Sequence, residues 1–348
     1  MQNLSKITDA TELRFIPVVG PASLTDFVAA AHPRAQPWAD SFVLARECIG
    51  AAERARLYRS VKFGGLVRIR PGVFLPLDLW HAAPPDERYL LHIRAAALVS
   101  GEPLVFAGAS AAALWGLPVV GAWPQNPVVI ARRAAGGRSA GNLVRRCEGL
   151  PPEIWSVDGL AATSLARTVV DVARFGALET AIAVADRALA AKPNHATGAL
   201  AIRVDKGELV AELGSLGEAH GNVRARVRIE FADGDSGSVG ESASRVMVDR
   251  LGFPRPVLQQ VFRDELGRMF ADFWWPDYNL VGEFDGKSKY LRDEFTGGRS
   301  PAQVVLDEKA REDRLRRLGP SVVRWDWADA TSPARLRRVL LGAGLPCR

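Results

Sequence analysis

Three carboxylates in the last third of the chain are candidates for chemistry. Glu241 begins an expected helix, whereas Asp272 and Glu283 lie inside apolar segments, FADFWWP and LVGEFDG. A carboxylate in an apolar strand is costly to bury unless a cation compensates its charge. Because Mg²⁺ takes carboxylate oxygens and keeps several waters, Asp272 and Glu283 predict a hydrated Mg²⁺, or Mn²⁺, that also meets a phosphate.

The elements around these residues must bring both carboxylates to one face of a sheet. The apolar pattern predicts an antiparallel meander with PDYN as one of its turns, which would let Asp272 and Glu283 point the same way. A helix precedes the meander, and a helix, a strand and a last helix from about Ser332 follow it. The expected bounds are 238–252 for the first helix, 257–263, 269–275 and 280–285 for the strands, then 302–318 and 321–327.

The order of these residues resembles the PD-(D/E)XK nuclease superfamily, and most closely its uncharacterised endonuclease-like branch related to very-short-patch-repair nucleases. The resemblance covers residues 238–328 and rests on Glu241, Asp272, the run Glu283-Phe284-Asp285-Gly286, and a basic helix with Glu308, Lys309 and Arg311.

The resemblance implies that Asp272 and Glu283 are the metal ligands, that the Phe284 carbonyl adds a ligand, and that Glu241 supports the metal or its water. The family motif has a lysine two positions after the glutamate, whereas this chain has Asp285 there. Two alternatives follow for this position. Asp285 is a further ligand, or one of two nearby lysines orients the attacking water, Lys287 or Lys289.

Several of these residues also have a purely structural interpretation. Ser238 and Glu241 have the spacing of a capping box, and Asp285-Gly286 fits a simple turn. The helix over 302–318 has opposite charges four positions apart, which is typical of a solvated face. That interpretation competes with a phosphate-facing role for two of its cations, Lys309 and Arg311.

A second candidate site is basic and lies near the N-terminus. The chain has a net charge of +6, and residues 41–76 hold seven Lys and Arg against two Asp and Glu. A short helix from Ser41, a helix over 51–63 and a ribbon with a Pro71-Gly72 turn are the order of a winged helix-turn-helix. The cations expected to neutralise phosphates are Arg54, Arg59, Lys62, Arg68 and Arg70. The alternative is a solvated basic face.

The chain of 348 residues is too long for one core, and we expect a multi-domain α/β protein. A Gly, Ser and Asp-rich segment, FADGDSGSVG, marks the clearest boundary. The expected parts are an irregular lead-in at 1–40, the winged helix-turn-helix at 41–76, a mixed α/β domain at 77–200, a helical connector and linker at 201–237, and the restriction-endonuclease-like α/β core at 238–348.

The N-terminal and middle parts resemble the antitoxin-like transcriptional regulators of the type IV abortive-infection class. The matching runs are LVRIRPGVF, SAAALWGLP and TSLARTVVD. The middle domain is expected to contain a strand over 127–131 and a long helix over 164–190. Arg167 and Asp171, four positions apart on that helix, are interpreted as a helix ion pair rather than a site.

The composition narrows the function further. Three widely separated cysteines argue against zinc knuckles and disulfide frameworks, and the N-terminus shows no secretory signal, so we expect a cytoplasmic protein. The first hypothesis is a DNA-binding protein with a Mg²⁺-dependent endonuclease domain, acting on DNA rather than RNA. The alternative is a non-enzymatic antitoxin-like regulator with a degenerate nuclease fold, whose partners would be a cognate toxin or further copies of the chain.

Overall fold

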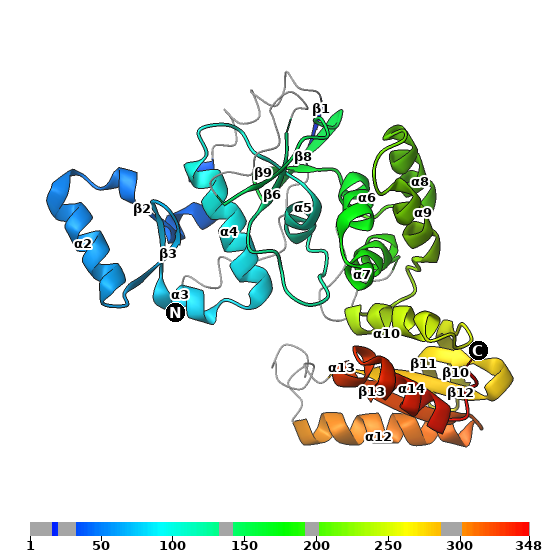
Figure 1. Ribbon diagram of the computed structural model, residues 1–348. Helices are drawn as coiled ribbons and strands as arrows, with labels where there is room; N and C mark the ends of the chain where they lie inside the picture. Colours follow the sequence, from blue (N-terminus) through cyan, green and yellow to red (C-terminus); the bar gives the residue numbers. More distant parts are fainter. Residues whose placement is uncertain (1–15, 20–32, 132–141, 192–201, 287–300, 348) are drawn as a thin grey trace. The chain divides into compact units, whose positions relative to one another are not determined.

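The computed structural model describes residues 16–19, 33–131, 142–191, 202–286 and 301–347, without the side chains of 16–19, 301–306 and 308. It is a mixed α/β protein whose described strands form three sheets (Figure 1). The chain divides into two compact units. Unit 1 contains residues 1–117, 121–176 and 207–222, and unit 2 contains 118–120, 177–206 and 223–348.

The N-terminal part of unit 1 is a small sheet with one long helix. The strands have the order β2-β4-β3, all antiparallel. The chain enters this sheet through short turns and leaves it through two helices. The bounds are η2 Pro33–Ala35, η3 Pro37–Ser41, β2 Val43–Leu44, η4 Ala45–Glu47, α2 Gly50–Lys62, β3 Leu66–Arg70, β4 Val73–Pro76, α3 Leu77–Ala82 and α4 Pro85–Val99.

This part confirms the expected second helix and ribbon but not the first helix. The helix expected from Ser41 is wrong, because Phe42 is extended and buried and Val43–Leu44 pair with β4 as an edge strand. Gly72 takes φ +78° in the turn between β3 and β4, a backbone conformation that favours glycine. The structure therefore has a strand and a 3-10 turn before α2.

The rest of unit 1 is a six-stranded mixed sheet with the order β1-β8-β9-β5-β6-β7. The strand expected over 127–131 is confirmed as β6. The bounds are β1 Ile16–Val19, β5 Val105–Phe106, α5 Gly108–Leu114, β6 Val128–Ile130, β7 Val144–Arg146, β8 Glu153–Val157, β9 Leu160–Thr163, α6 Leu165–Phe175 and α8 Lys206–Ser215.

The long helix expected over 164–190 is wrong, because the structure divides it in two. α6 ends at Phe175, and α7 runs from Leu178 to Leu189. Gly176 is extended, and its N–H donates 2.8 Å to the carbonyl of Val172. A Cβ at Gly176 would lie 2.8 Å from that same carbonyl oxygen, so glycine suits this break.

Unit 2 is built around a four-stranded sheet with the order β10-β11-β12-β13. The first three strands form the expected antiparallel meander, and β13 returns through α12 to lie parallel to β12. The expected order of a helix, three strands, a helix and a strand is confirmed. The bounds are α9 Asn222–Phe231, α10 Val239–Arg250, β10 Val257–Asp264, β11 Gly267–Trp275, η6 Pro276–Tyr278, β12 Leu280–Asp285, α12 Pro301–Arg317, β13 Ser321–Asp326, α13 Trp327–Ala330 and α14 Pro333–Gly342.

Unit 2 also takes in α7, which lies before the expected linker in the chain. Asp186 of α7 is buried, and its two carboxylate oxygens each accept a hydrogen bond of 2.8 Å from Nη2 of Arg245 of α10. It also accepts from Ser242 at 2.7 Å. The FADGDSGSVG segment therefore lies inside unit 2, although it was expected to separate two domains.

The two faces of this sheet have different partners. Phe273, Trp275 and Trp325 pack with α10, α13 and α14 in one apolar cluster. Successive strand residues alternate between faces, so Glu283 points away from this cluster whereas its neighbour Phe284 points into it. Within unit 2, α12 runs along the face that Glu283 occupies (Figure 1). No described helix has both the length and the apolar character needed to cross a membrane.

Close packing between α10 and β12 gives a first prediction. A Cβ added at Gly240 would lie 1.9 Å from Cε1 of Phe284, whose ring is held edge-on by Trp327. Gly240→Ala should therefore lower the free energy of unfolding by about 1–3 kcal/mol, as overpacked cores do. Urea unfolding of the full chain measures this.

The matched control is Gly342→Ala in α14, where a Cβ meets nothing within 4 Å. It should leave stability unchanged or slightly higher, because alanine favours helix. Equal stabilities of the two variants would contradict the packing described for Gly240.

Candidate functional site

Asp272 and Glu283 lie on neighbouring strands, as the sequence predicts. Phe273 pairs with Gly282 across β11 and β12, which places Asp272 across from Glu283. Oδ2 of Asp272 accepts a hydrogen bond of 3.0 Å from the backbone N–H of Phe284. The structure therefore brings the Asp272 carboxylate to the end of β12 that carries Glu283.

Two arginines already compensate Glu283. Nη2 of Arg311, from α12, lies 2.8 Å from Oε1, and Nη2 of Arg324, from β13, lies 2.8 Å from Oε2. The Glu283 side chain is 6% exposed. Burial raises the pKa of this carboxyl; the two arginines act against that rise, and Asp272 adds to it. Glu283 is thus a buried carboxylate whose charge depends on its neighbours.

Glu241 is joined to Asp272 through a residue between them. Gln259 of β10 donates from Nε2 to Oε2 of Glu241 at 3.0 Å and to Oδ1 of Asp272 at 3.4 Å. Glu241 also accepts from the N–H of Gly237 at 2.7 Å, and its own N–H donates to Oγ of Ser238. The Ser238 half of the predicted capping box is therefore present, whereas the Glu241 carboxylate accepts from Gly237 instead of from the Ser238 N–H and also contacts the site.

Gln259 has an unusual backbone for a strand residue. Its φ is +48°, in the left-handed region that costs a residue with a side chain about 1–2 kcal/mol. Strained backbone of this kind concentrates at functional sites. The sequence pattern offers no signal for this conformation.

The remaining residues that the sequence predicts for this site are on β12 and α12 or lie outside the described residues. Asp285 is the last residue of β12, half-buried, and strand alternation puts it on the same face as Glu283. Lys287 and Lys289 lie outside the described residues. Lys309 is exposed on α12, and Arg311 also donates to the carbonyl of Phe270.

The oxygen atoms of Asp272 and Glu283 are ligands of the kind that a hard cation prefers. Asp272, Glu283 and the nearby backbone offer only oxygen ligands, which Mg²⁺ and Mn²⁺ prefer. In the described part of the chain, no group of three or more His, Cys, Asp or Glu side chains is arranged to hold a metal ion. Arginines contact both oxygens of Glu283, so an ion that used Glu283 as a ligand would have to share or replace one of these contacts.

The basic candidate site is formed by α2 and β3. Arg54, Arg59, Lys62 and Arg68 are all exposed, and we call them the α2 basic face. Arg70 is 6% exposed and donates from Nη1 to the carbonyl of Asn142 at 3.2 Å. Burial lowers the pKa of Arg70.

A bulge in β3 explains why Arg70 does not join the α2 basic face. The register with β4 shifts between Arg68 and Arg70, so the alternation expected from the sequence is broken there. Ile69 and Arg70 are both buried as a result.

Two proteins of Mycobacterium tuberculosis resemble this chain over most of its length. They are "Uncharacterized protein MT2308" of strain CDC 1551 / Oshkosh and "Uncharacterized protein Rv2248" of strain H37Rv. Each is 31% identical over 274 residues, which is 78% of this chain and 89% of the relative. The chain belongs to their family.

Two other comparisons add less. No family model matches the chain. A solved structure, the RV2827C protein from Mycobacterium tuberculosis, is similar at a TM-score of 0.34 and 16% identity, over 72% of this chain and 94% of that one.

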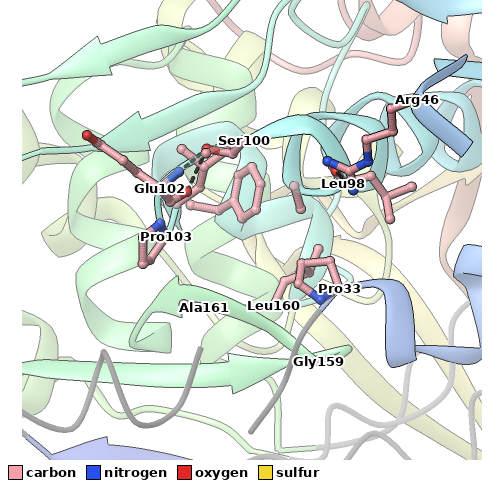
Figure 2. Close-up of a pocket in the computed structure, with 13 residues that line it drawn as sticks. Pro33, Arg46, Leu98, Ser100, Glu102, Pro103, Gly159, Leu160 and Ala161 are labelled. Atoms are coloured by element: carbon pink, nitrogen blue, oxygen red, sulfur yellow. Dashed lines mark hydrogen bonds between the residues drawn. The ribbon is translucent and has the colours of Figure 1, made fainter. Parts of the chain in front are cut away.

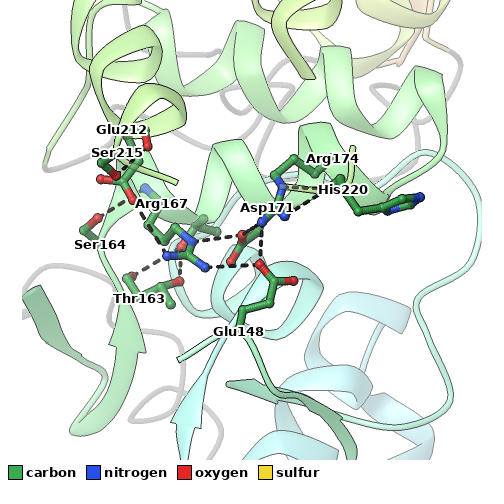
Figure 3. A network of polar contacts seen from close by, with 10 residues as sticks. Glu148, Thr163, Ser164, Arg167, Asp171, Arg174, Glu212, Ser215 and His220 are labelled. Atoms are coloured by element: carbon green, nitrogen blue, oxygen red, sulfur yellow. Dashed lines mark hydrogen bonds and ion pairs between the residues drawn. The ribbon is translucent and has the colours of Figure 1, made fainter. Parts of the chain in front are cut away.

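The expected ion pair of Arg167 and Asp171 is part of a larger network in unit 1 (Figure 3). Nε of Arg167 lies 2.9 Å from Oδ1 of Asp171, which confirms the pair. Arg174 contacts Glu148 at 2.5 Å and the carbonyl of His220 at 2.9 Å. The network joins α6 to the segments on either side and pairs its buried charges, so we assign it a structural role.

Unit 1 also contains a pocket of about 200 Å³ between the end of α4, the start of β5 and the β8–β9 turn (Figure 2). None of the residues predicted for a site lines it. Arg46, which lines the pocket, donates a hydrogen bond to the carbonyl of Leu98 at 2.9 Å. The hydroxyl of Ser100 donates one to the carbonyl of Glu102. These polar groups serve the local backbone.

The bridge through Gln259 gives a second prediction. Gln259→Ala and Gln259→Gly both remove the amide that joins Glu241 to Asp272. Only the glycine variant relaxes the backbone, so it should be about 1 kcal/mol more stable than the alanine variant in urea unfolding. Alanine at the neighbouring Gln260, which donates only to a backbone carbonyl, is the control. An alanine variant at 259 as stable as the glycine variant would show that the left-handed backbone is not strained.

Proposed function

We propose that the C-terminal part of the chain is a Mg²⁺-dependent endonuclease domain that hydrolyses phosphodiester bonds, with DNA preferred over RNA. The observation that carries the proposal is the pair Asp272 and Glu283. These two carboxylates lie on the neighbouring strands β11 and β12, each one residue beyond the Phe273–Gly282 pair, in strand segments that are otherwise largely apolar. Such a pair is typical of sites that hold a divalent ion against a phosphate.

The order of elements supports the resemblance to the PD-(D/E)XK superfamily. In this proposal α10, the β10–β12 meander, the crossover α12 and the parallel β13 form a restriction-endonuclease-like core. In this proposal Glu241, at the start of α10, would support the metal or its water, and Asp285, at the end of β12, occupies the position where the superfamily motif has a lysine.

The proposal assigns a separate role to each residue of the site. Asp272 and Glu283 would hold Mg²⁺ or Mn²⁺, with the Phe284 carbonyl as a further oxygen ligand. When bound, the ion supplies a polarised water at neutral pH and neutralises phosphate charge. Glu241 orients Asp272 through Gln259, whose amide contacts both. Lys287 or Lys289 would orient the water, or Asp285 would be a third carboxylate ligand.

The α2 basic face would hold the nucleic acid backbone. Its four cations are exposed on one helix and the adjoining strand. Contacts with phosphates give affinity that does not depend on base sequence and that falls as salt rises. The proposal therefore combines a winged-helix-like region for binding with a nuclease domain for cleavage.

Carboxamide variants give the third prediction. Asp272→Asn and Glu283→Gln keep the side-chain shape but lose the charge that holds the ion, so each should reduce cleavage of DNA at least about 100-fold. Cleavage is followed on supercoiled and linear DNA and on RNA with Mg²⁺, with Mn²⁺ and with EDTA.

Asp277→Asn is the matched control, because this carboxylate is exposed in the turn between the same two strands. It should cleave as fast as the unmodified chain. An Asp272→Asn variant that cuts equally well, or a full chain that cuts nothing with either metal, would overturn the nuclease proposal.

A second candidate function is a non-enzymatic, antitoxin-like transcriptional regulator. The observation that favours it is that arginines contact both oxygens of Glu283, so its charge is compensated by protein groups. Asp285 in place of the family lysine points the same way. In this case the C-terminal domain would bind nucleic acid without cleaving it, and the partners would be a cognate toxin or other copies of the chain.

DNA binding by the α2 basic face gives the fourth prediction, which both candidates share. Arg59→Ala and Arg68→Ala should each weaken binding to duplex DNA and reduce the slope of log affinity against log salt by about 1. Fluorescence anisotropy at several salt concentrations measures this. Arg337→Ala, which removes an exposed cation from α14, is the charge-matched control.

The Asp272→Asn variant also distinguishes the two candidate functions. Under the regulator alternative, the Asp272→Asn variant binds DNA as tightly as the unmodified chain, and neither of these two proteins cuts it.

Unchanged affinity and salt slope in both arginine variants, Arg59→Ala and Arg68→Ala, would rule out the α2 basic face as the binding surface.

A further inference from the structure

The two arginines on Glu283 are held very differently. Arg324 lies on β13, directly beside Glu283 in the parallel register. Its Nε also contacts Oε2 of Glu312 at 3.1 Å, and Glu312 in turn contacts Arg316 at 2.6 Å. Arg324 is therefore fixed by a strand and by a second carboxylate.

Arg311 has fewer constraints. It comes from α12, its side chain is 35% exposed, and it also donates a hydrogen bond to the carbonyl of Phe270. A long side chain at a helix surface can turn toward solvent by rotating about its own bonds, with the helix backbone unchanged. Of the two guanidinium groups on Glu283, that of Arg311 is the one that can leave.

Charge favours its departure when a divalent ion arrives. Asp272 and Glu283 are balanced by Arg311 and Arg324, so these four groups together are neutral. A divalent ion added to all four would leave an excess of two positive charges, of which Asp285, half-buried on the same face, compensates one, and the remaining charge in a partly buried site is unfavourable. Movement of Arg311 away from Glu283 removes that remaining charge and frees Oε1 as a ligand.

We propose that Arg311 competes with the divalent ion for Glu283 and, once displaced, binds a phosphate of the nucleic acid. The inference rests on the proposed nuclease function and adds a regulation to it. Arg311 is then a positioning residue that couples two binding events. Because the displaced guanidinium gains a new partner only when a phosphate is present, nucleic acid and metal should each tighten the binding of the other.

The test measures metal affinity rather than cleavage. Binding of Mn²⁺ to the full chain is followed by electron paramagnetic resonance at low salt, first without DNA and then with a short duplex present. Without DNA, Arg311→Ala should bind Mn²⁺ at least about fivefold more tightly than the unmodified chain, since the competing cation is gone. The tightening caused by DNA should shrink by a similar factor.

Two further variants keep this test decisive. Arg311→Gln removes the charge but keeps a polar side chain on α12, so it should behave like the alanine variant if the latter folds poorly. Arg317→Ala removes an exposed charge from the same helix, away from Glu283, and should leave Mn²⁺ affinity unchanged.

The possible outcomes distinguish a failure of the proposed competition from a failure of the proposed nuclease function. If Mn²⁺ binds in a way that Asp272→Asn abolishes, but both Arg311 variants bind it equally or more weakly, the competition is wrong and the nuclease proposal stands. If no Asp272-dependent binding of Mn²⁺ is found in any variant, both fail. Tighter binding in the Arg317 variant as well would also overturn the inference, because it would reflect only total charge.

Discussion

A carboxylate buried in the middle of a sheet must have its charge compensated, and the arrangement of unit 2 around Glu283 meets this requirement. Glu283 lies between Asp272, which repels its charge, and two guanidinium groups, which attract it. Removing one partner from a buried pair of this kind leaves an uncompensated charge, at a cost of about 3–5 kcal/mol. The positions of the Arg311 and Arg324 side chains are therefore coupled to the charge state of one residue on β12.

The topology supplies each partner from a different element. The antiparallel β11 places Asp272 across from Glu283, and the parallel β13 places Arg324 beside it in register. Parallel pairing requires a crossover, and that crossover is α12, which carries Arg311 to the same face. The opposite face is filled by the aromatic cluster around Trp275 and Trp325, which leaves polar groups only the side next to α12.

The sequence predicted the elements from α10 to β13 well because β11, β12 and β13 are largely apolar runs ended by turn residues, and PDYN and the Gly319-Pro320 break are strong signals of that kind. It predicted that Asp272 and Glu283 meet, since strand alternation and a short turn suffice for that. It could not predict the arginines on Glu283, because their approach depends on a parallel register set by a crossover. The left-handed Gln259, and the bulge that buries Arg70, are local departures from alternation that residue types do not reveal.

Asp285 changes the electrostatics of this face in a way that bears on both candidate functions. Together with Asp272 and Glu283 it gives three carboxylates on the side of the sheet that Arg311 and Arg324 occupy, so these five groups carry a net charge of −1 when all are ionised. A phosphate is repelled by such a surface. One added divalent charge reverses the sign to +1, and a phosphate is then attracted. In the proposed nuclease, an acid at the position where the PD-(D/E)XK motif has a lysine would therefore make the approach of a phosphate backbone to this face depend on a bound cation, whereas a lysine there would attract it in either state.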